Sequence, residues 1–161
     1  MFRRSKDRWV ILSLVGALIM GSHSAAAWCY EAQKESSLYD RLGGLAPISV
    51  VVSDFIDILV QDVVLNANPA VDAARERVPA PYLKYHLTAM VCQAAGGPCL
   101  YQGREMKISH AHLGITELEW GRMVALFKEV LAKHKLTANE MQALVAIVNS
   151  TKADIVDTGR E

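Results

Sequence analysis

Apolar side chains recur at three- and four-residue spacing in four long stretches of this 161-residue chain. They are Ile48, Val51, Val52, Phe55, Ile58 and Leu59; Leu83, Leu87, Met90, Val91 and Ala94; Trp120, Met123, Phe127, Val130 and Leu131; and Met141, Leu144, Val145 and Val148. This spacing puts the apolar residues of each stretch on one face of an α-helix. Such helices are stable when their apolar faces pack against one another, so the pattern predicts an all-α fold.

Residues that favour helix starts stand before three of these stretches. Thr116 with Glu119, and Thr137 with Glu140, form capping boxes, in which each side chain bonds the backbone N–H of the other residue. Pro47 suits the first turn of a helix, because the N–H that proline lacks would have no helical partner there. These signals predict helices that begin near residues 47, 116 and 137.

Two further helices are expected to be short. One covers residues 37–42 and is capped by Ser37, and the other covers residues 106–112 and is closed by Gly114. The remaining long helix is predicted over residues 82–95, where a glycine pair follows it. We therefore expect about five or six helices.

Two stretches leave the local structure open. Residues 66–69 and 79–81 contain prolines that break the helical pattern, and residues 71–77 between them could hold one or two helical turns. Val50–Val52 could form a strand instead, because runs of valine favour sheets. The apolar spacing around them favours the helix.

The first 27 residues have the composition of a secretory signal peptide. Four basic residues within the first eight precede an apolar run from Trp9 to Met20, and small residues follow up to Ala27. An uncleaved membrane anchor is the alternative, but the apolar run is shorter than the roughly 20 residues that span a bilayer. We expect cleavage after Ala27 and export, to the periplasm or beyond the cell.

This prediction sets the domain boundaries. Residues 1–27 are the signal, residues 28–36 a flexible lead-in, residues 37–156 one globular domain and residues 157–161 a tail. After the signal the chain carries 13 basic and 16 acidic residues and no basic run. Nucleic acid is therefore not the expected partner, and a membrane would be contacted only through an uncleaved signal.

The cysteines fit an exported protein. Cys29, Cys92 and Cys99 are an odd number, which suggests one disulfide and one spare thiol. Cys92 and Cys99 are the expected pair, because the Gly96-Gly97-Pro98 reversal between them could bring their Cα atoms within bonding range. Two buried free thiols are the alternative.

Four histidines follow the signal, and imidazole is the side chain best suited to bind a transition metal near neutral pH. His86 and His110 lie on separate predicted helices beside apolar residues, so two helices could offer ligands to one pocket. His110 and His112 are two residues apart and cannot face the same way on a helix. A single histidine in such a place is more often structural than a ligand. His134 lies near a helix C-terminus, where a cation favours the dipole.

Several stretches in order resemble the group I truncated haemoglobins. They are Ser37-Leu38-Tyr39-Asp40-Arg41-Leu42-Gly43-Gly44, Val51-Val52-Ser53-Asp54-Phe55, Gly96-Gly97-Pro98, and the run from Tyr101 to Ile115 that contains His110-Ala111-His112-Leu113-Gly114-Ile115. The likeness extends from residue 37 to about residue 154. It implies a two-over-two helical sandwich around haem, iron protoporphyrin IX.

The resemblance also implies site residues. The first histidine of the family's His-x-x-x-Gly-Ile stretch binds the iron, and His110 holds that position. Other contacts to the haem are expected from Phe55, Ile56, Tyr82, Leu83, Leu87, Met106 and Ile115.

On the opposite face of the haem the chain departs from the family. Ile56 stands where many members have a tyrosine that donates a hydrogen bond to bound oxygen, and Leu83 and Leu87 stand where glutamine is common. His86 falls where some members place a second iron ligand; contact with solvent or a haem propionate is the alternative. Residues 66–69 replace a Phe-Phe pair that packs on the haem.

Three functions are consistent with this reading. The first is a haem globin that binds oxygen, nitric oxide or carbon monoxide, with six-coordinate iron and a redox partner of unknown identity as options. The second is a haem enzyme, a nitric oxide dioxygenase or a peroxidase-like catalyst. The third is a helical interaction module that has lost haem. Ile56, Leu83 and Leu87 offer no hydrogen bond to bound oxygen, so oxygen storage and nitric oxide dioxygenation are less expected.

Overall fold

The computed structural model describes residues 36–159, so the predicted signal and nearly all of the lead-in lie outside the described residues. Within that range the elements are helices: Leu38–Arg41 (α1), Leu45–Leu59 (α2), Val63–Asn66 (α3), Pro69–Arg77 (α4), Ala80–Ala94 (α5), Met106–His110 (α6), Glu117–Lys133 (α7), Ala138–Asn149 (α8) and Lys152–Ile155 (α9). The one β contact among these residues is an isolated bridge between Ile115 and Val156. The all-α prediction is confirmed, and none of the described helices is long and apolar enough to span a bilayer.

Side-chain caps explain the helix boundaries that the sequence predicted correctly. Ser37 accepts a hydrogen bond from the Asp40 amide at 3.1 Å, which begins α1. The capping boxes at Thr116 and Thr137 are both formed, at the starts of α7 and α8. These contacts involve residues only three apart, so the local sequence specifies them.

The expected number of helices was wrong, because short helices went unrecognised. α3 is one turn, and it begins because the Asp62 carboxylate accepts hydrogen bonds from the Val64 and Leu65 amides, each at 3.1 Å. α9 is also one turn, with no side-chain cap. Four residues are too few to show a helical period, so such turns depend on the surrounding structure.

Two predicted boundaries also need correction. α5 begins at Ala80 rather than at residue 82, because Pro81 occupies its first turn, where a missing N–H costs nothing; the predicted break between the helices falls at Val78 and Pro79. α6 ends at His110 rather than at residue 112, because Ala111 is extended and His112 has a φ of 69°. Val50–Val52 lie inside α2, so the strand alternative was wrong.

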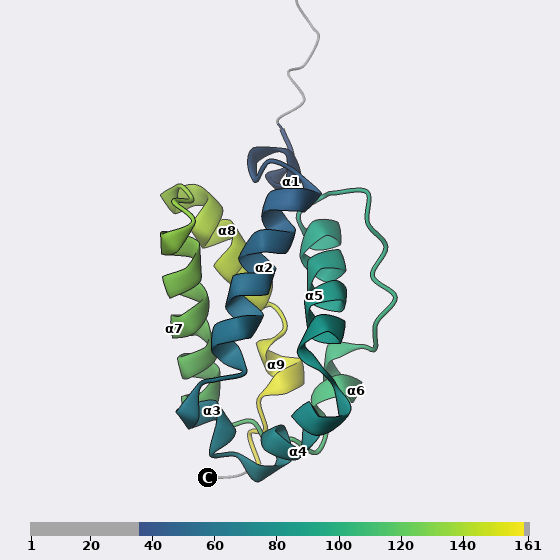
Figure 1. The fold of residues 1–161 in the computed structure, drawn as a ribbon, viewed down its shortest axis with the longest axis vertical. Helices are drawn as coiled ribbons and strands as arrows, with labels where there is room; N and C mark the ends of the chain where they lie inside the picture. The colour runs from purple at the N-terminus through teal and green to yellow at the C-terminus, as the bar shows by residue number, and fades with distance from the viewer. Residues whose placement is uncertain (1–35, 160–161) are drawn as a thin grey trace, which may run out of the picture. The chain divides into compact units, whose positions relative to one another are not determined.

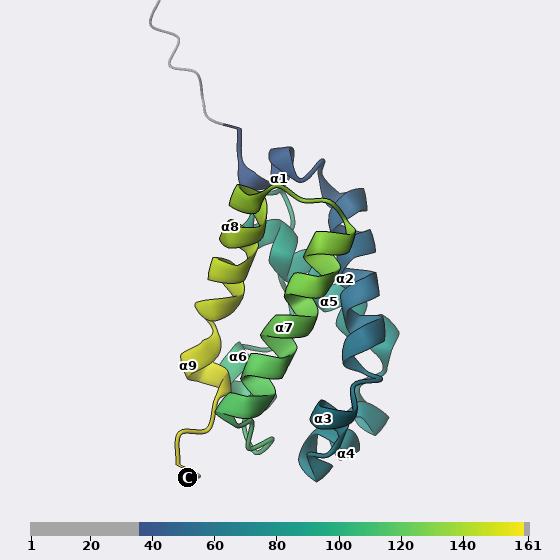
Figure 2. The ribbon, with the colours of Figure 1, turned by 90° about the vertical axis from the view of Figure 1, so that its left-hand side faces the viewer.

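Helix α2 is at the centre of the packing. It packs along α5 on one side and α7 on the other, and α8 packs against α7 (Figures 1 and 2). The buried core follows these contacts, and the rings of Phe55 on α2 and Phe127 on α7 meet edge to face with centroids 5.0 Å apart. The predicted apolar faces of the four long helices therefore do meet.

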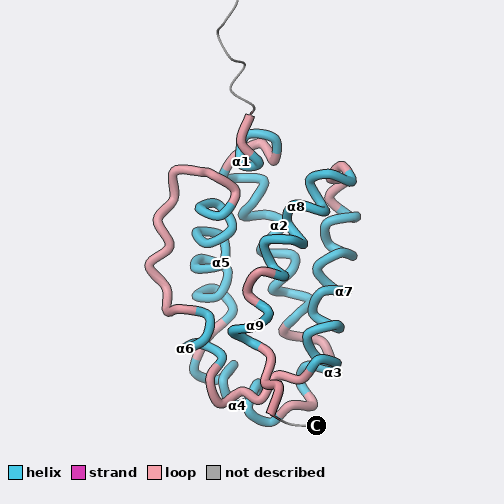
Figure 3. The backbone as a smooth tube through the Cα atoms, turned by 180° about the vertical axis from the view of Figure 1, so that it is seen from behind, coloured by secondary structure: helices cyan, strands magenta, loops and turns pink. Residues whose placement is uncertain are grey.

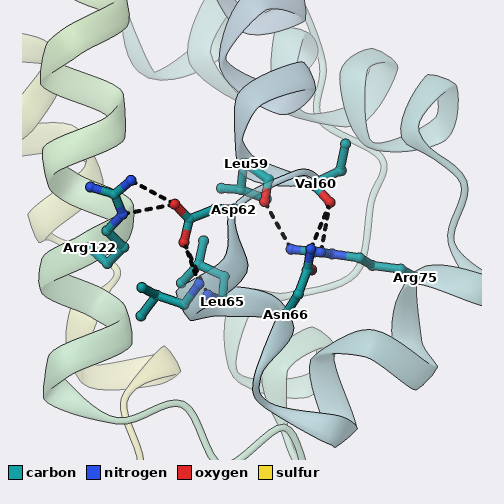
Figure 4. Close-up of polar contacts among 8 residues, drawn as sticks. Leu59, Val60, Asp62, Leu65, Asn66, Arg75 and Arg122 are labelled. Carbon is teal, nitrogen blue, oxygen red and sulfur yellow. Dashed lines mark hydrogen bonds and ion pairs between the residues drawn. The ribbon is translucent and has the colours of Figure 1, made fainter.

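Polar contacts fix the corner where α2, α3 and α4 meet (Figure 4). Arg75 of α4 donates to the carbonyl oxygens of Leu59 and Val60, each at 2.9 Å, and thereby satisfies two acceptors that the end of α2 leaves free. The Asn66 side-chain amide also donates to Val60. Arg122 of α7 binds the buried Asp62 carboxylate at 2.7 and 2.8 Å, so α3 is tied to α7.

We expect Asp62→Asn to lower the free energy of unfolding at pH 7 by about 1–3 kcal/mol. Asparagine keeps the oxygen that caps α3 but loses the ion pair with Arg122. The hydrogen bond from Arg122 lowers the pKa of Asp62 below its usual 3.8, so this stabilisation is present above pH 4 and is lost as the pH falls through the folded-state pKa. Urea unfolding of both proteins across this pH range should show that the difference between their free energies of unfolding becomes smaller in acid.

The matched control is Asp57→Asn. Asp57 pairs with Lys84 at 2.7 Å, but its side chain is 51% exposed, so the loss should stay under about 1 kcal/mol. If Asp57→Asn and Asp62→Asn lowered the free energy of unfolding equally, the proposed role of the ion pair between Asp62 and Arg122 would be wrong.

Candidate functional site

Helix α6 holds His110 in an orientation suited to metal binding. Met106 and His110 are its first and last residues, and the Nδ1 atom of His110 lies 2.9 Å from the Met106 carbonyl oxygen. A carbonyl only accepts hydrogen bonds, so Nδ1 carries the proton and the lone pair lies on Nε2. This is the second-shell arrangement that orients histidine ligands in metal sites. The half-buried imidazole can therefore offer Nε2 to an iron atom.

The other histidines near it are differently placed. His112 is exposed, and its left-handed backbone turns the chain away from the helix. His134 is engaged elsewhere, because its Nε2 atom lies 2.9 Å from the Asp54 carboxylate. Hydrogen bonds from Lys133 and then His134 lower the pKa of Asp54. Neither imidazole is a competing ligand for the site of His110.

Four of the predicted site residues meet in one apolar cluster. Phe55 and Ile56 of α2 are buried, and Leu83 and Leu87 of α5 are half-buried against the same core. They meet because α2 packs along α5. None of these four side chains has a hydrogen-bond donor, so the cluster that they form is apolar.

His86 lies beside that wall among three tyrosines. Its ring centroid is 4.2 Å from that of Tyr82, 5.1 Å from Tyr85 and 6.1 Å from Tyr101. Its Nδ1 atom is buried and has no hydrogen-bond partner among the described residues. Buried polar atoms are nearly always paired, so this nitrogen is available to a partner that lies beyond the described residues.

Tyr101 is the contact to His86 that the sequence analysis missed. It lies in the long loop from α5 to α6, which runs beside α5 (Figure 3). Its amide donates to the Gln93 side chain at 2.7 Å and its hydroxyl to the Arg104 carbonyl at 2.8 Å, and burial raises the pKa of that hydroxyl. The matching run from Tyr101 to Ile115 was the signal that could have identified it.

The corner after α5 is closely packed. Cys92 is fully buried, its Cα atom is 5.8 Å from that of Cys99, and the two sulfur atoms are at bonding distance. A Cβ atom on Gly97 would lie 2.8 Å from the Cys92 carbonyl oxygen and would overlap the ring of Tyr39. Glycine is therefore required here for close approach, which explains part of the Gly96-Gly97-Pro98 run.

The remaining predicted residues are divided between two helix pairs. Met106 and Ile115 belong to the region where α6 packs on α9, whereas His86 and the half-exposed Tyr82 lie on α5, which packs on α2. The two candidate iron ligands thus come from separate packing units. A cavity of about 330 Å³ lies elsewhere, around Pro47, Val51 and Leu144, and none of the predicted site residues lines it.

Comparison with protein families gives an extended match. A model of the bacterial-like globins matches residues 37–157, nearly the whole of the described chain.

Individual relatives are more distant. A group 1 truncated haemoglobin of Nostoc sp. strain MUN 8820 is 28% identical over 123 residues, which cover 76% of this chain and 98% of the relative. One from Chlamydomonas moewusii is 24% identical over 127 residues, which cover 78% of this chain and 71% of the relative.

Solved structures show the same fold. The truncated haemoglobin of Tetrahymena pyriformis in its Fe(III) form aligns with a TM-score of 0.65 at 17% identity, and covers 76% of this chain and 100% of its own. The 2/2 haemoglobin of Synechococcus sp. PCC 7002, solved with covalently attached haem, aligns with a TM-score of 0.64 at 21% identity, and covers 75% and 98%. These likenesses support the fold that the sequence predicted.

Proposed function

Because the chain belongs to the bacterial-like globin family and has the fold of the truncated haemoglobins, we propose that it binds one haem and uses it for diatomic ligands. His110 is the proximal iron ligand in this proposal. The observation that carries it is the hydrogen bond between the Nδ1 atom of His110 and the Met106 carbonyl, which leaves Nε2 with a free lone pair. Haem iron, when bound, would supply binding of diatomic ligands and a ferrous–ferric couple.

The distal residues argue against tight oxygen binding. Ile56, Leu83 and Leu87 offer no donor to a bound ligand, and bound oxygen carries partial negative charge that a donor would stabilise. The missing hydrogen bond is worth about 0.5–1.5 kcal/mol, so oxygen would leave several times faster than from a site with a donor. Carbon monoxide and nitric oxide depend less on such a donor, and these are the better candidates.

His86 is the proposed sixth ligand. It comes from α5, the helix that also supplies Leu83 and Leu87, and its buried Nδ1 atom has no partner in the described part of the chain. The ring contacts with Tyr82 and Tyr101 limit its rotation. A six-coordinate iron would change its ligands little on oxidation, which favours electron exchange with a redox partner.

Replacing His110 tests the whole assignment. We expect His110→Gly to weaken haem binding by more than about tenfold, since loss of a supporting partner alone costs ten- to a hundredfold in metal sites. Added imidazole should restore the ferrous absorption spectrum by filling the vacated space. His112→Gly, two residues away at an exposed site, is the control and should bind haem normally. An unchanged spectrum and affinity in His110→Gly would refute the assignment.

Replacing His86 tests the sixth ligand. In His86→Leu the ferrous spectrum should change from six- to five-coordinate, and carbon monoxide should bind at least about tenfold faster, because an internal ligand that occupies the iron reduces the fraction open to gas. The matched control is His134→Leu, which removes an imidazole whose Nε2 atom lies 2.9 Å from the Asp54 carboxylate. If His86→Leu and the parent protein gave the same spectra and rates, His86 would not bind the iron.

We also propose that the protein is exported and that residues 1–27 are removed. The composition of those residues supports this, and so does the position of Cys92 and Cys99 at bonding distance, since disulfides persist in oxidising compartments. Mass spectrometry of the full chain expressed in a bacterium should find it in the periplasm, beginning at Trp28 and without free thiols at Cys92 and Cys99. A cytoplasmic chain that still begins at Met1 would contradict export.

A further inference from the structure

The segment just after His110 is held by two distant parts of the chain. The Asn68 side-chain amide donates to the Leu113 carbonyl at 2.9 Å, and the Asp157 backbone amide donates to the Ile115 carbonyl at 2.8 Å. Leu113 in turn donates from its own amide to the His110 carbonyl at 3.1 Å. A continuous path of hydrogen bonds therefore joins Asn68 to the backbone of the proposed iron ligand.

Local structure alone does not fix His110. α6 has five residues, and no side chain caps its first turn. Helices this short are unstable without external contacts. The exit from α6 is also strained, because His112 has a φ of 69°, which residues with a side chain seldom adopt. Contacts from outside the segment must hold it in this conformation.

Asn68 is suited to this task because its orientation is fixed. Its Oδ1 atom caps α4 by accepting from the Ala70 amide at 3.0 Å and the Val71 amide at 3.3 Å. The side chain cannot turn over without losing both bonds, so its Nδ2 atom stays directed at Leu113. Asn68 thus links α4 to the proximal segment, residues 111–115. Arg75 in turn ties α4 to α2.

The C-terminal segment, residues 152–157, holds the other side. α9 packs on α6, as Figure 1 also shows, and Lys152 pairs with Glu117 at the start of α7 at 2.8 Å. Val156 is buried and forms the parallel bridge with Ile115. The segment after His110, residues 111–115, is therefore supported by one residue that precedes it by 45 positions and by a segment near the end of the domain.

We infer that Asn68 and residues 152–157 are positioning elements that set the angle at which His110 meets the iron. The inference rests on the proposed function, since it assumes that His110 is the iron ligand. Asn68 then has two functions: its Oδ1 atom caps α4, and its Nδ2 atom holds the Leu113 carbonyl.

Two substitutions remove one donor each. Asn68→Ser keeps a hydroxyl that can cap α4 but loses Nδ2. Asp157→Pro removes the amide that binds Ile115, together with the carboxylate that accepts a hydrogen bond from the Gly159 amide. Matched controls are Asn66→Ser, which loses the amide bond to Val60 away from His110, and Asp157→Ala, which keeps the backbone N–H. All four are made in the full chain with His86→Leu, so that ferrous iron has no internal sixth ligand.

The measurements are the ferrous iron–histidine stretching frequency by resonance Raman and the rate of haem transfer to an acceptor apoprotein. We expect Asn68→Ser and Asp157→Pro to shift and broaden the stretching band, and to speed haem loss by about three- to tenfold, the change expected from one lost hydrogen bond. The controls should leave the band unchanged. Urea unfolding of each haem-free protein separates general destabilisation from this effect, because lower stability alone does not move the band.

The outcomes distinguish the two proposals. If the parent binds haem through His110 but Asn68→Ser and Asp157→Pro match their controls in frequency and rate, the positioning role is wrong and the proposed function stands. If the parent's haem binding is unaffected by His110→Gly, both are wrong.

Discussion

Burial of α2 between α5 and α7 is the interaction on which the rest of the structure depends. It forms the core through Phe55, Phe127 and their neighbours, and it brings Ile56 beside Leu83 and Leu87. The helix therefore stabilises the domain and would also form one wall of the proposed site. Because the same residues serve both purposes, that wall is apolar and has little room for polar donors without a cost to the core.

The opposite side of the site is built on a different physical basis. α6 is too short to be stable alone, and its position depends on hydrogen bonds and a bridge from Asn68, Val156 and Asp157. The proposed proximal ligand thus lies on a segment that other elements hold, whereas His86 lies on a long helix in the main packing. Because α5 packs on α2 and α6 packs on α9, the two sides could enclose a flat ligand without packing directly against each other.

Much of the fold could be predicted from the sequence, and the reason is local. The capping pairs at Thr116 and Thr137 act over three residues, and the apolar spacing within α2, α5, α7 and α8 reports which face is buried. The one-turn helices α3 and α9 could not be predicted, because four residues carry no period. The same is true of the early end of α6, where the turn at His112 is imposed by its surroundings.

The amino-acid sequence was enough to predict the helical class, the apolar faces of the long helices and, through the resemblance of the run around His110, the candidate ligand. The folded chain was needed to show that the Nδ1 atom of His110 bonds the Met106 carbonyl, that a buried nitrogen of His86 has no partner among the described residues, and that Asn68 reaches Leu113 from 45 residues away. The physical reason is the distance along the chain over which each interaction acts. Caps and helical periods act between near neighbours, whereas the orientation of an imidazole depends on atoms that folding brings from distant parts of the chain.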